Sequence, residues 1–177
     1  MEKTVKQHQG EPLPIVKVFE DINNFSYTNP IGHPFGIRIV KIVKEVFRLD
    51  LLDVRWYVMG IDDIMFAADN LLQVLRKYDS SEFYYIGNPW KSHSSNAYFS
   101  HGMDFVGGGI TMSYPLARAL SSILDECLEW YPFLFGNDDW LHACISNLGV
   151  PLTKELGFHQ FDVHGNAFGL KIGRAHV

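Results

Sequence analysis

The sequence has few cysteines, no long apolar run and no cluster of charge of one sign. Its 177 residues contain two cysteines, Cys127 and Cys144, which are too few to define a disulfide framework. No run approaches the roughly 20 apolar residues of a membrane-spanning helix, and residues 1–9 lack the apolar region of a signal peptide. The net charge is -5, and the scattered lysines and arginines argue against nucleic acid or an anionic membrane surface as a partner.

The composition is that of a globular chain with a sizeable core. Hydrophobic residues make up 47% of the sequence and aromatic residues 14%, so we expect one folded domain or a large piece of one. The periodicity predicts helices over residues 37–49, 67–78, 114–131 and 138–148, and strands over residues 54–59, 83–86 and 110–112. This order predicts an α/β fold with parallel strand pairing.

Two adjacent carboxylates, Asp62 and Asp63, follow the predicted strand at residues 54–59. That strand is short and rich in β-forming residues, so we expect it to be buried on both faces. An unpaired carboxylate is costly to bury, and the pair therefore needs a cation, a donor-rich ligand or open solvent. Ligands of parallel sheets bind at the carboxyl ends of strands. The pair is a candidate site, and the alternative is a loop with two solvated acids.

Three glycines, Gly107, Gly108 and Gly109, precede the predicted strand at residues 110–112. Glycines allow the backbone to approach a ligand closely, but they equally suit a tight turn or a bulge before a strand. No Gly-Lys-Ser or Gly-Lys-Thr follows them, which excludes a phosphate-binding loop of the nucleotide triphosphatase type.

A second acidic pair, Asp138 and Asp139, opens the predicted helix at residues 138–148, with Asn137 as its expected N-cap. The helix dipole favours acids in a first turn, so capping and chemistry are both open roles for this pair. Asn24-Phe25-Ser26 is a glycosylation sequon. Such triplets are common by chance, and this one has meaning only in a secretory protein.

Five motifs in one order resemble those of Fringe-like glycosyltransferases, and the plant branch of that group is the most similar. They are Arg55-Trp56-Tyr57-Val58-Met59-Gly60-x-Asp62-Asp63, Tyr84-Tyr85-Ile86-Gly87, Gly107-Gly108-Gly109, Gly136-Asn137-Asp138-Asp139 and the run from Leu148 to Gln160. The similarity covers nearly all of residues 12–170. Several motifs in the right order are more specific than any single one.

The resemblance implies a GT-A fold, in which a Rossmann-like sheet is flanked by helices. It also implies a divalent metal, usually Mn²⁺, a UDP-sugar donor, and transfer to a hydroxyl of a glycan or protein acceptor with inversion at the anomeric carbon. Carboxylate oxygens and an imidazole suit Mn²⁺. Such a metal would neutralise the charge that develops on the leaving diphosphate.

The resemblance assigns a role to each candidate residue. It places the metal on Asp63, the last acid of a three-aspartate motif, and on His159. It places donor contacts on Asp62 and on the glycines 107–109. As a lone histidine among aromatic residues, His159 equally suits a packed or surface role.

The catalytic base falls on the acidic pair Asp138-Asp139, with Asp139 the better match and Asp138 the second choice. Such a base would take the proton from the acceptor hydroxyl.

Two positions depart from the family pattern. Ile61 stands where an aspartate often begins the acidic motif, and its side chain can neither ligate a metal nor accept a hydrogen bond. Phe161 stands at the second position of the His-x-His arrangement of Fringe itself. The alternative function is therefore a catalytically inactive GT-A-like domain that acts as a binding or scaffold protein. A metal-dependent hydrolase using the same acids is a third option.

The resemblance also sets the expected boundaries. Residues 1–171 would form one partial Fringe-like domain without its first βαβ units, and residues 172–177 match one reading frame of a sequencing adapter, so we expect them to be non-biological. The full-length parent is expected to be anchored in the Golgi membrane with this domain in the lumen. In that compartment Cys127 and Cys144 could form a disulfide across two neighbouring helices, and otherwise they are two ordinary buried cysteines.

Overall fold

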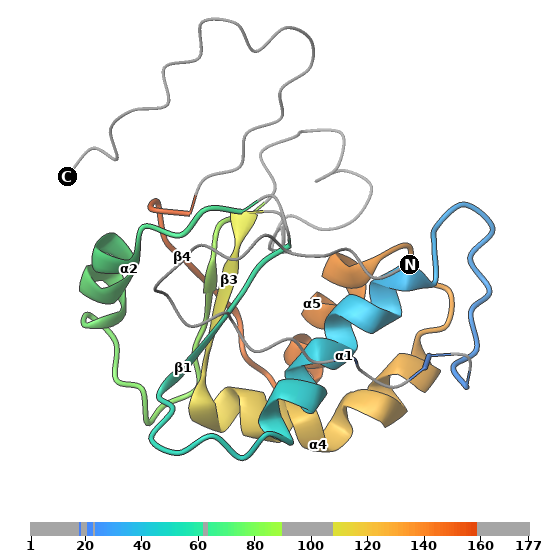
Figure 1. The fold of residues 1–177 in the computed structure, drawn as a ribbon. Helices are drawn as coiled ribbons and strands as arrows, with labels where there is room; N and C mark the ends of the chain where they lie inside the picture. The colour runs from blue at the N-terminus through green and yellow to red at the C-terminus, as the bar shows by residue number, and fades with distance from the viewer. Residues whose placement is uncertain (1–17, 19–20, 23, 62–63, 90–107, 159–177) are drawn as a thin grey trace, which may run out of the picture.

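The computed structural model describes residues 18, 21–22, 24–61, 64–89 and 108–158, which form a mixed four-stranded sheet flanked by helices (Figure 1). The described elements are, in chain order, α1 (Phe35–Phe47), β1 (Trp56–Met59), α2 (Ala68–Leu75), β2 (Tyr85–Gly87), β3 (Ile110–Ser113), α4 (Tyr114–Trp130), α5 (Asn137–Asn147) and β4 (Leu152–Lys154). This arrangement confirms the predicted α/β class. Residues 172–177, expected to be a non-biological tail, lie outside the described ranges.

The strand order is β1-β3-β2-β4. Strands β1 and β2 each pair antiparallel with β3, and β2 pairs parallel with β4. The prediction of parallel pairing between the first two strands is therefore wrong. They run in the same direction, but β3 enters between them from the opposite end, with Thr111 opposite both Val58 and Ile86. A pattern of alternating helices and strands does not reveal such an inserted strand.

Helices α1, α4 and α5 cover one face of the sheet, and α2 lies on the other (Figure 1). The alternation of side chains along each strand produces two cores. Tyr85 and Met112 face the main core together with Leu120 and Trp140, all of them at most 1% exposed. Ile86 faces the smaller core, whose other buried members are Leu75 and Phe158. The main core is formed where the apolar faces of the predicted amphipathic helices pack on the sheet.

Strand β1 is an edge strand of the described sheet, and the prediction that it is buried on both faces is wrong. Val58 remains 36% exposed. Between β1 and α1 lies a cavity of about 170 Å³ with an apolar lining that includes Ile42, Val46 and Met59. A four-residue apolar strand carries no alternation from which its position in a sheet could be deduced.

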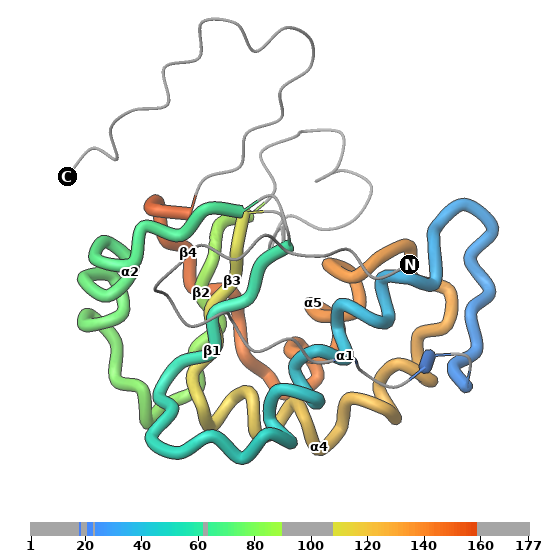
Figure 2. The backbone as a smooth tube through the Cα atoms, viewed as in Figure 1, coloured from blue at the N-terminus to red at the C-terminus, as the bar shows by residue number. Residues whose placement is uncertain are grey.

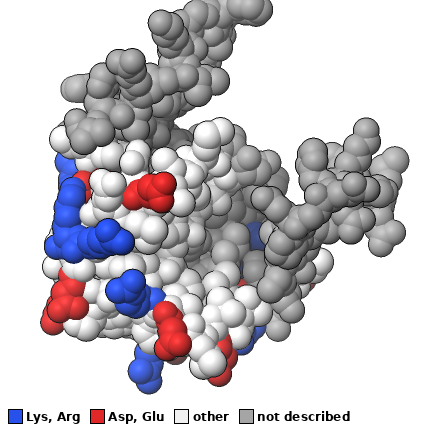
Figure 3. Space-filling model, turned by 60° about the vertical axis from the view of Figure 1, so that its left-hand side comes forward, with Lys and Arg blue, Asp and Glu red and all other residues white. Residues whose placement is uncertain are grey.

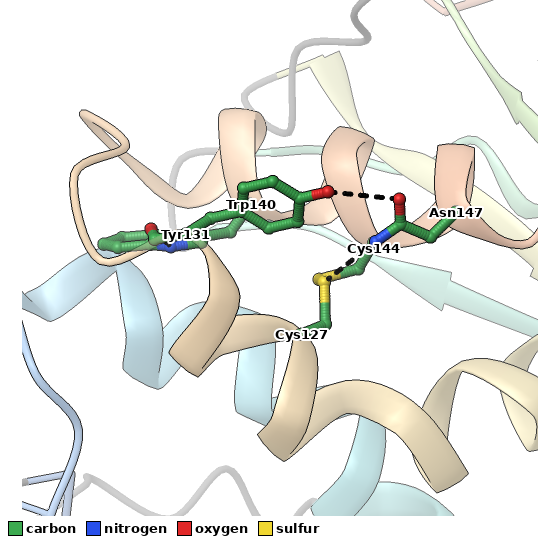
Figure 4. The surroundings of a disulfide bond; sticks show 5 residues. All are labelled: Cys127, Tyr131, Trp140, Cys144 and Asn147. Carbon is green, nitrogen blue, oxygen red and sulfur yellow. Dashed lines mark hydrogen bonds between the residues drawn. A yellow bond between two sulfur atoms is a disulfide. The ribbon is translucent and has the colours of Figure 1, made fainter.

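Helices α4 and α5 are joined by a disulfide between Cys127 and Cys144, whose Cα atoms lie 5.8 Å apart (Figure 4). Both sulfurs are buried. The Trp140 indole N–H donates to the Tyr131 carbonyl oxygen at 2.8 Å, and the Asn147 amide lies 3.8 Å from Cys127 Sγ. The expected pairing of the two cysteines is confirmed, and it fixes α5 against α4 in the middle of the helical layer.

The turn that follows helix α2 is bonded to Glu155, the residue after β4. The Tyr78 hydroxyl donates to Glu155 Oε1 at 2.5 Å, and Lys77 Nζ lies 3.1 Å from the same oxygen. Figure 3 shows this side of the molecule, where lysines and arginines are interspersed with acids over the described surface. The scattered charge of the sequence is therefore scattered in space on this face as well.

Candidate functional site

Three features lie toward the same end of the sheet: the carboxyl end of β1, the start of β3 and the N-terminus of α5 (Figure 2). Met59, the last residue of β1, pairs with Ile110, the first residue of β3. Because β3 runs antiparallel to β1, the residues after β1 and the residues before β3 meet at this edge. The described ends of β1 and β3 and the first turn of α5, which carries the second acidic pair, therefore lie toward one end of the fold.

The segment that follows the first acidic pair folds back onto the ends of β1 and β3. A Cβ at Gly60 would lie 2.6 Å from Ile64 Cδ1, and a Cβ at Gly109 would lie 2.9 Å from Phe66 Cε1. Gly109 also has a φ of +81°, which side chains rarely adopt. Gly109 is thus explained by a tight turn under the Phe66 ring, which is the structural role that the sequence left open.

Of the other two glycines, Gly107 and Gly108, the structure describes only Gly108. Gly108 is half-buried directly before the turn at Gly109, while Gly107 lies outside the described residues. Asp62, Asp63 and His159, proposed from the sequence as donor and metal ligands, also lie outside them.

Ile61, the residue directly before the first acidic pair, is half-buried and packs against the main core. Its carbonyl oxygen accepts a hydrogen bond from the Ile64 N–H at 3.3 Å. The side chain that replaces the expected aspartate is therefore used for packing. Phe161, the second departure from the family pattern, lies outside the described residues.

The second acidic pair lies in the first turn of α5, which begins at Asn137, one residue earlier than predicted. The N-cap is Gly136, not Asn137. Asp139 Oδ2 accepts hydrogen bonds from the backbone N–H groups of Phe135 at 3.2 Å and Gly136 at 3.3 Å. The capping role that the sequence allowed for Asp139 is thus present in the structure.

Burial dominates the electrostatics of Asp139. It raises the pKa of this half-buried carboxyl above the usual value, although the hydrogen bonds from Gly136 and Phe135 act in the opposite direction. Both hydrogen bonds use Oδ2, and among the described residues no donor is bonded to Oδ1. A carboxylate with a raised pKa is well suited to act as a general base.

Asp138 is also half-buried, and its Oδ1 accepts a hydrogen bond from the Asn137 side-chain amide at 2.9 Å. The amide that was expected to cap the helix is thus bonded to the neighbouring acid. Asp138 and Asp139 are adjacent in a helical turn, so their side chains point in different directions.

Tyr27 is a neighbour of this turn that the sequence did not single out. Its hydroxyl donates to the Phe135 carbonyl oxygen at 3.3 Å, and its ring lies 5.6 Å from that of Trp140. Burial and the nearby Asp139 charge both raise the pKa of Tyr27. More than a hundred residues separate Tyr27 from α5 along the chain, so no local pattern could have connected them.

A second overlooked residue is His142, one helical turn beyond Asp139. It is half-buried, and burial lowers the pKa of its imidazole, so the neutral form is favoured. The spacing of three residues from Asp139 on one helix is a signal that could have pointed to it.

Within the described ranges, no group of three or more His, Cys, Asp or Glu side chains could hold a metal ion. The same part of the chain contains no helix with the length and hydrophobicity of a transmembrane span.

Comparison with known proteins adds two findings. The sequence profile of a family described as "Protein of unknown function, DUF604" matches residues 95–176. Two curated β-1,3-glucosyltransferases, from Mus musculus and Homo sapiens, are each 25% identical over 175 residues, which cover 89% of this chain and 35% and 34% of those proteins. The chain thus spans about a third of the length of the relatives it matches, and it is distantly similar to glycosyltransferases.

Proposed function

We propose that this chain is part of a metal-dependent, inverting glycosyltransferase domain that transfers a sugar from a UDP-sugar to an acceptor hydroxyl. The observation that carries the proposal is the similarity to two β-1,3-glucosyltransferases over 89% of the chain. That similarity extends across both acidic pairs and the glycine triplet. The convergence of β1, β3 and α5 at one end of the sheet supports it, because ligand sites of α/β folds lie at the carboxyl ends of strands.

The donor side of the site would be formed by the residues that follow β1 and precede β3. Asp63 and His159 would hold Mn²⁺, with Asp62 and the glycines 107–109 contacting the donor. A hard carboxylate and an imidazole are ligands that suit this ion. The metal, when bound, would neutralise the charge of the leaving diphosphate. The Phe66 ring lies close to Gly109, so the chain after the first acidic pair packs against the start of β3.

The acceptor side would be formed by the first turn of α5. Asp139, with Asp138 as the second choice, would take the proton from the acceptor hydroxyl as its oxygen forms the new bond to the anomeric carbon. The bond between that carbon and the diphosphate oxygen breaks in the same step. The raised pKa of Asp139 supports this role, because a more basic carboxylate is a better proton acceptor.

The disulfide supports the expected location of the parent protein in the Golgi membrane with this domain in the lumen. A disulfide between two buried cysteines is favoured in the oxidising compartments of the secretory pathway and is rare in the cytosol.

A catalytically inactive binding or scaffold domain is the second candidate, and the packing of Ile61 favours it. Its side chain is half-buried against the main core and offers no oxygen to a donor or a metal. Calorimetry of the full-length protein with UDP separates the two candidates. Tight binding that depends on Mn²⁺ would argue against the inactive domain.

The activity test uses the full-length parent protein with Mn²⁺ and a panel of UDP-sugars. We expect metal-dependent turnover that falls by at least about a hundredfold in Asp63→Asn and Asp139→Asn, because each change removes a charge that the reaction uses. Asp69→Asn is the matched control, since Asp69 is exposed on α2. Full activity in both site variants would overturn the assignment. Release of free sugar without transfer would point to a hydrolase.

A further inference from the structure

The loop between residues 21 and 34 carries the sequon Asn24-Phe25-Ser26, and the sequence contains no other Asn-x-Ser or Asn-x-Thr triplet. Figure 1 shows this loop in blue, at the margin of the molecule beyond α1. Such a triplet can be glycosylated only in a protein that enters the secretory pathway. The Cys127–Cys144 disulfide is an independent observation that favours this pathway.

The middle side chain of the sequon is packed against the protein, and the two outer side chains are exposed. Phe25 packs against the main core, and the Lys41 ammonium lies 4.6 Å from the centre of its ring. Asn24 and Ser26, on either side of it, are both exposed. The middle residue therefore anchors the loop, while the two residues that define the acceptor face solvent.

The backbone supports the same arrangement. The Phe25 N–H donates to the Ile22 carbonyl oxygen at 3.1 Å, which places Asn24 in a turn. Among the described residues, neither the Asn24 amide nor the Ser26 hydroxyl takes part in a hydrogen bond. A large substituent on Asn24 would therefore break no hydrogen bond within the described part of the chain and would extend into solvent.

We propose that Asn24 is an N-glycosylation site of this protein. The donor is an oligosaccharide linked to a lipid diphosphate, of the kind used by membrane-bound oligosaccharyltransferases. The bond from the first sugar carbon to the diphosphate oxygen breaks, and a bond from that carbon to Asn24 Nδ2 forms. One amide proton is lost, and the lipid diphosphate leaves. The inference rests on the lumenal location within the proposed function, and it is independent of catalysis.

The test expresses the chain behind a cleavable secretory leader in eukaryotic cells and measures intact mass before and after treatment with a peptide N-glycosidase. We expect one oligosaccharide on the unmodified sequence and on Ser26→Thr, which keeps the acceptor hydroxyl. Asn24→Gln and Ser26→Ala should each lose it. Both variants change exposed side chains, and loss in both excludes a folding defect specific to one of them.

The oxidation state of Cys127 and Cys144 serves as the internal control, measured on unreduced peptides. An oxidised pair with an unmodified Asn24 in the unaltered chain would overturn the proposal, as would glycan retained by Ser26→Ala. Neither result bears on sugar transfer. Conversely, a glycosylated Asn24 in a full-length protein without transferase activity would support the glycosylation site and refute the proposed sugar transfer.

Discussion

The Asp139 carboxylate lies 3.3 Å from the Gly136 backbone nitrogen, so one side chain both closes the first turn of α5 and stands at the proposed acceptor side. Asparagine keeps an oxygen for the backbone N–H groups but loses the charge, whereas alanine loses both. We expect Asp139→Ala to lower the free energy of unfolding by about 1 kcal/mol and Asp139→Asn to change it little. Urea denaturation measures both. Equal losses would show that the amide cannot replace the carboxylate as a cap.

The stability of the same two variants should depend on pH differently from that of the unaltered chain. Burial raises the pKa of Asp139, so the unfolded chain releases this proton at a lower pH than the folded protein does. Stability should therefore fall as the pH rises from the unfolded pKa, about 3.9, to the higher folded value, and then level off. Asp139→Asn should remove this fall. An unchanged profile in the variant would mean that other groups produce it.

The disulfide should contribute much of the stability of the helical layer. Cys127 and Cys144 are 17 residues apart in sequence, and closing a loop of that length in the unfolded chain is worth about 3 kcal/mol. We expect the double substitution Cys127→Ala and Cys144→Ala to lower the unfolding free energy by about that amount, measured in urea. Reductant should lower the stability of the unaltered chain similarly and leave the variant unchanged. Insensitivity of the unaltered chain to reductant would contradict the prediction.

The contact between Tyr78 and Glu155 should make the α2 side of the molecule sensitive to acid. Burial acts to raise the pKa of Glu155, but the Tyr78 hydrogen bond and the Lys77 ammonium outweigh it and lower that pKa. The stabilisation is present above the unfolded pKa of about 4.3 and is lost as the pH falls through the folded value. Tyr78→Phe should cost about 1 kcal/mol at pH 7, and the difference from the unaltered chain should shrink in acid.

Tyr84→Phe is the matched control for that variant. The Tyr84 ring lies 5.0 Å from that of Tyr78, but within the described part of the chain its hydroxyl has no hydrogen-bond partner. At the alkaline end, burial and the bond to Glu155 raise the pKa of Tyr78 to about 12. Stability should therefore fall as the pH rises above about 10, and less so in Tyr78→Phe. Equal acid profiles for Tyr78→Phe and Tyr84→Phe would refute the role of the hydroxyl.

Ile61 should not tolerate the aspartate that the family pattern would place there. Its half-buried side chain packs on the main core, and placing a carboxylate in that position should cost about 1–3 kcal/mol. Thermal unfolding of Ile61→Asp and Ile61→Val measures this, with valine expected to cost about 0.5 kcal/mol. Similar melting temperatures for the two variants would show that this position faces solvent in solution.

The position of β1 at an edge of the described sheet predicts self-association. Val58 is 36% exposed on that edge, and a lysine there should oppose the addition of a further strand. We expect Val58→Lys to weaken association in sedimentation experiments by roughly tenfold, equivalent to about 1.4 kcal/mol. Leu72→Lys adds the same charge on α2, where Leu72 is 51% exposed, and should have little effect. Equal effects of the two lysines would indicate general repulsion.

The sequence predicted best where one local pattern decided the outcome. The helices predicted over residues 37–49 and 114–131 are close to the observed α1 and α4. Ser113 is the N-cap residue of α4, yet its hydroxyl accepts a hydrogen bond from the Tyr84 N–H at 3.0 Å, directly before β2. The local sequence determines where the helix begins, and the packing of the sheet determines which N–H group the Ser113 hydroxyl contacts.

Features set by distant residues escaped prediction. Strand β4, three residues long, exists because it pairs with β2, and nothing in Leu152-Thr153-Lys154 distinguishes it from a loop. The contact of Tyr27 with the Phe135 carbonyl likewise depends on the whole fold. For the acidic pairs, residue type and position after a strand or at a helix start sufficed to select candidates. The capping role of Asp139 became evident only from its burial and from its hydrogen bonds with the Phe135 and Gly136 N–H groups.

The hydrogen bonds between the sequon loop and the segment before α5 impose an order on biosynthesis. Tyr27 and Asn29 bind carbonyl groups 108 and 104 residues later in the chain. Ribosomes add about 5–20 residues per second, so the loop waits for roughly 5–20 seconds before its partner segment has been made. During that interval Asn24 lies in a nascent chain whose partner segment has not been made, so this residue can be modified before α5 docks.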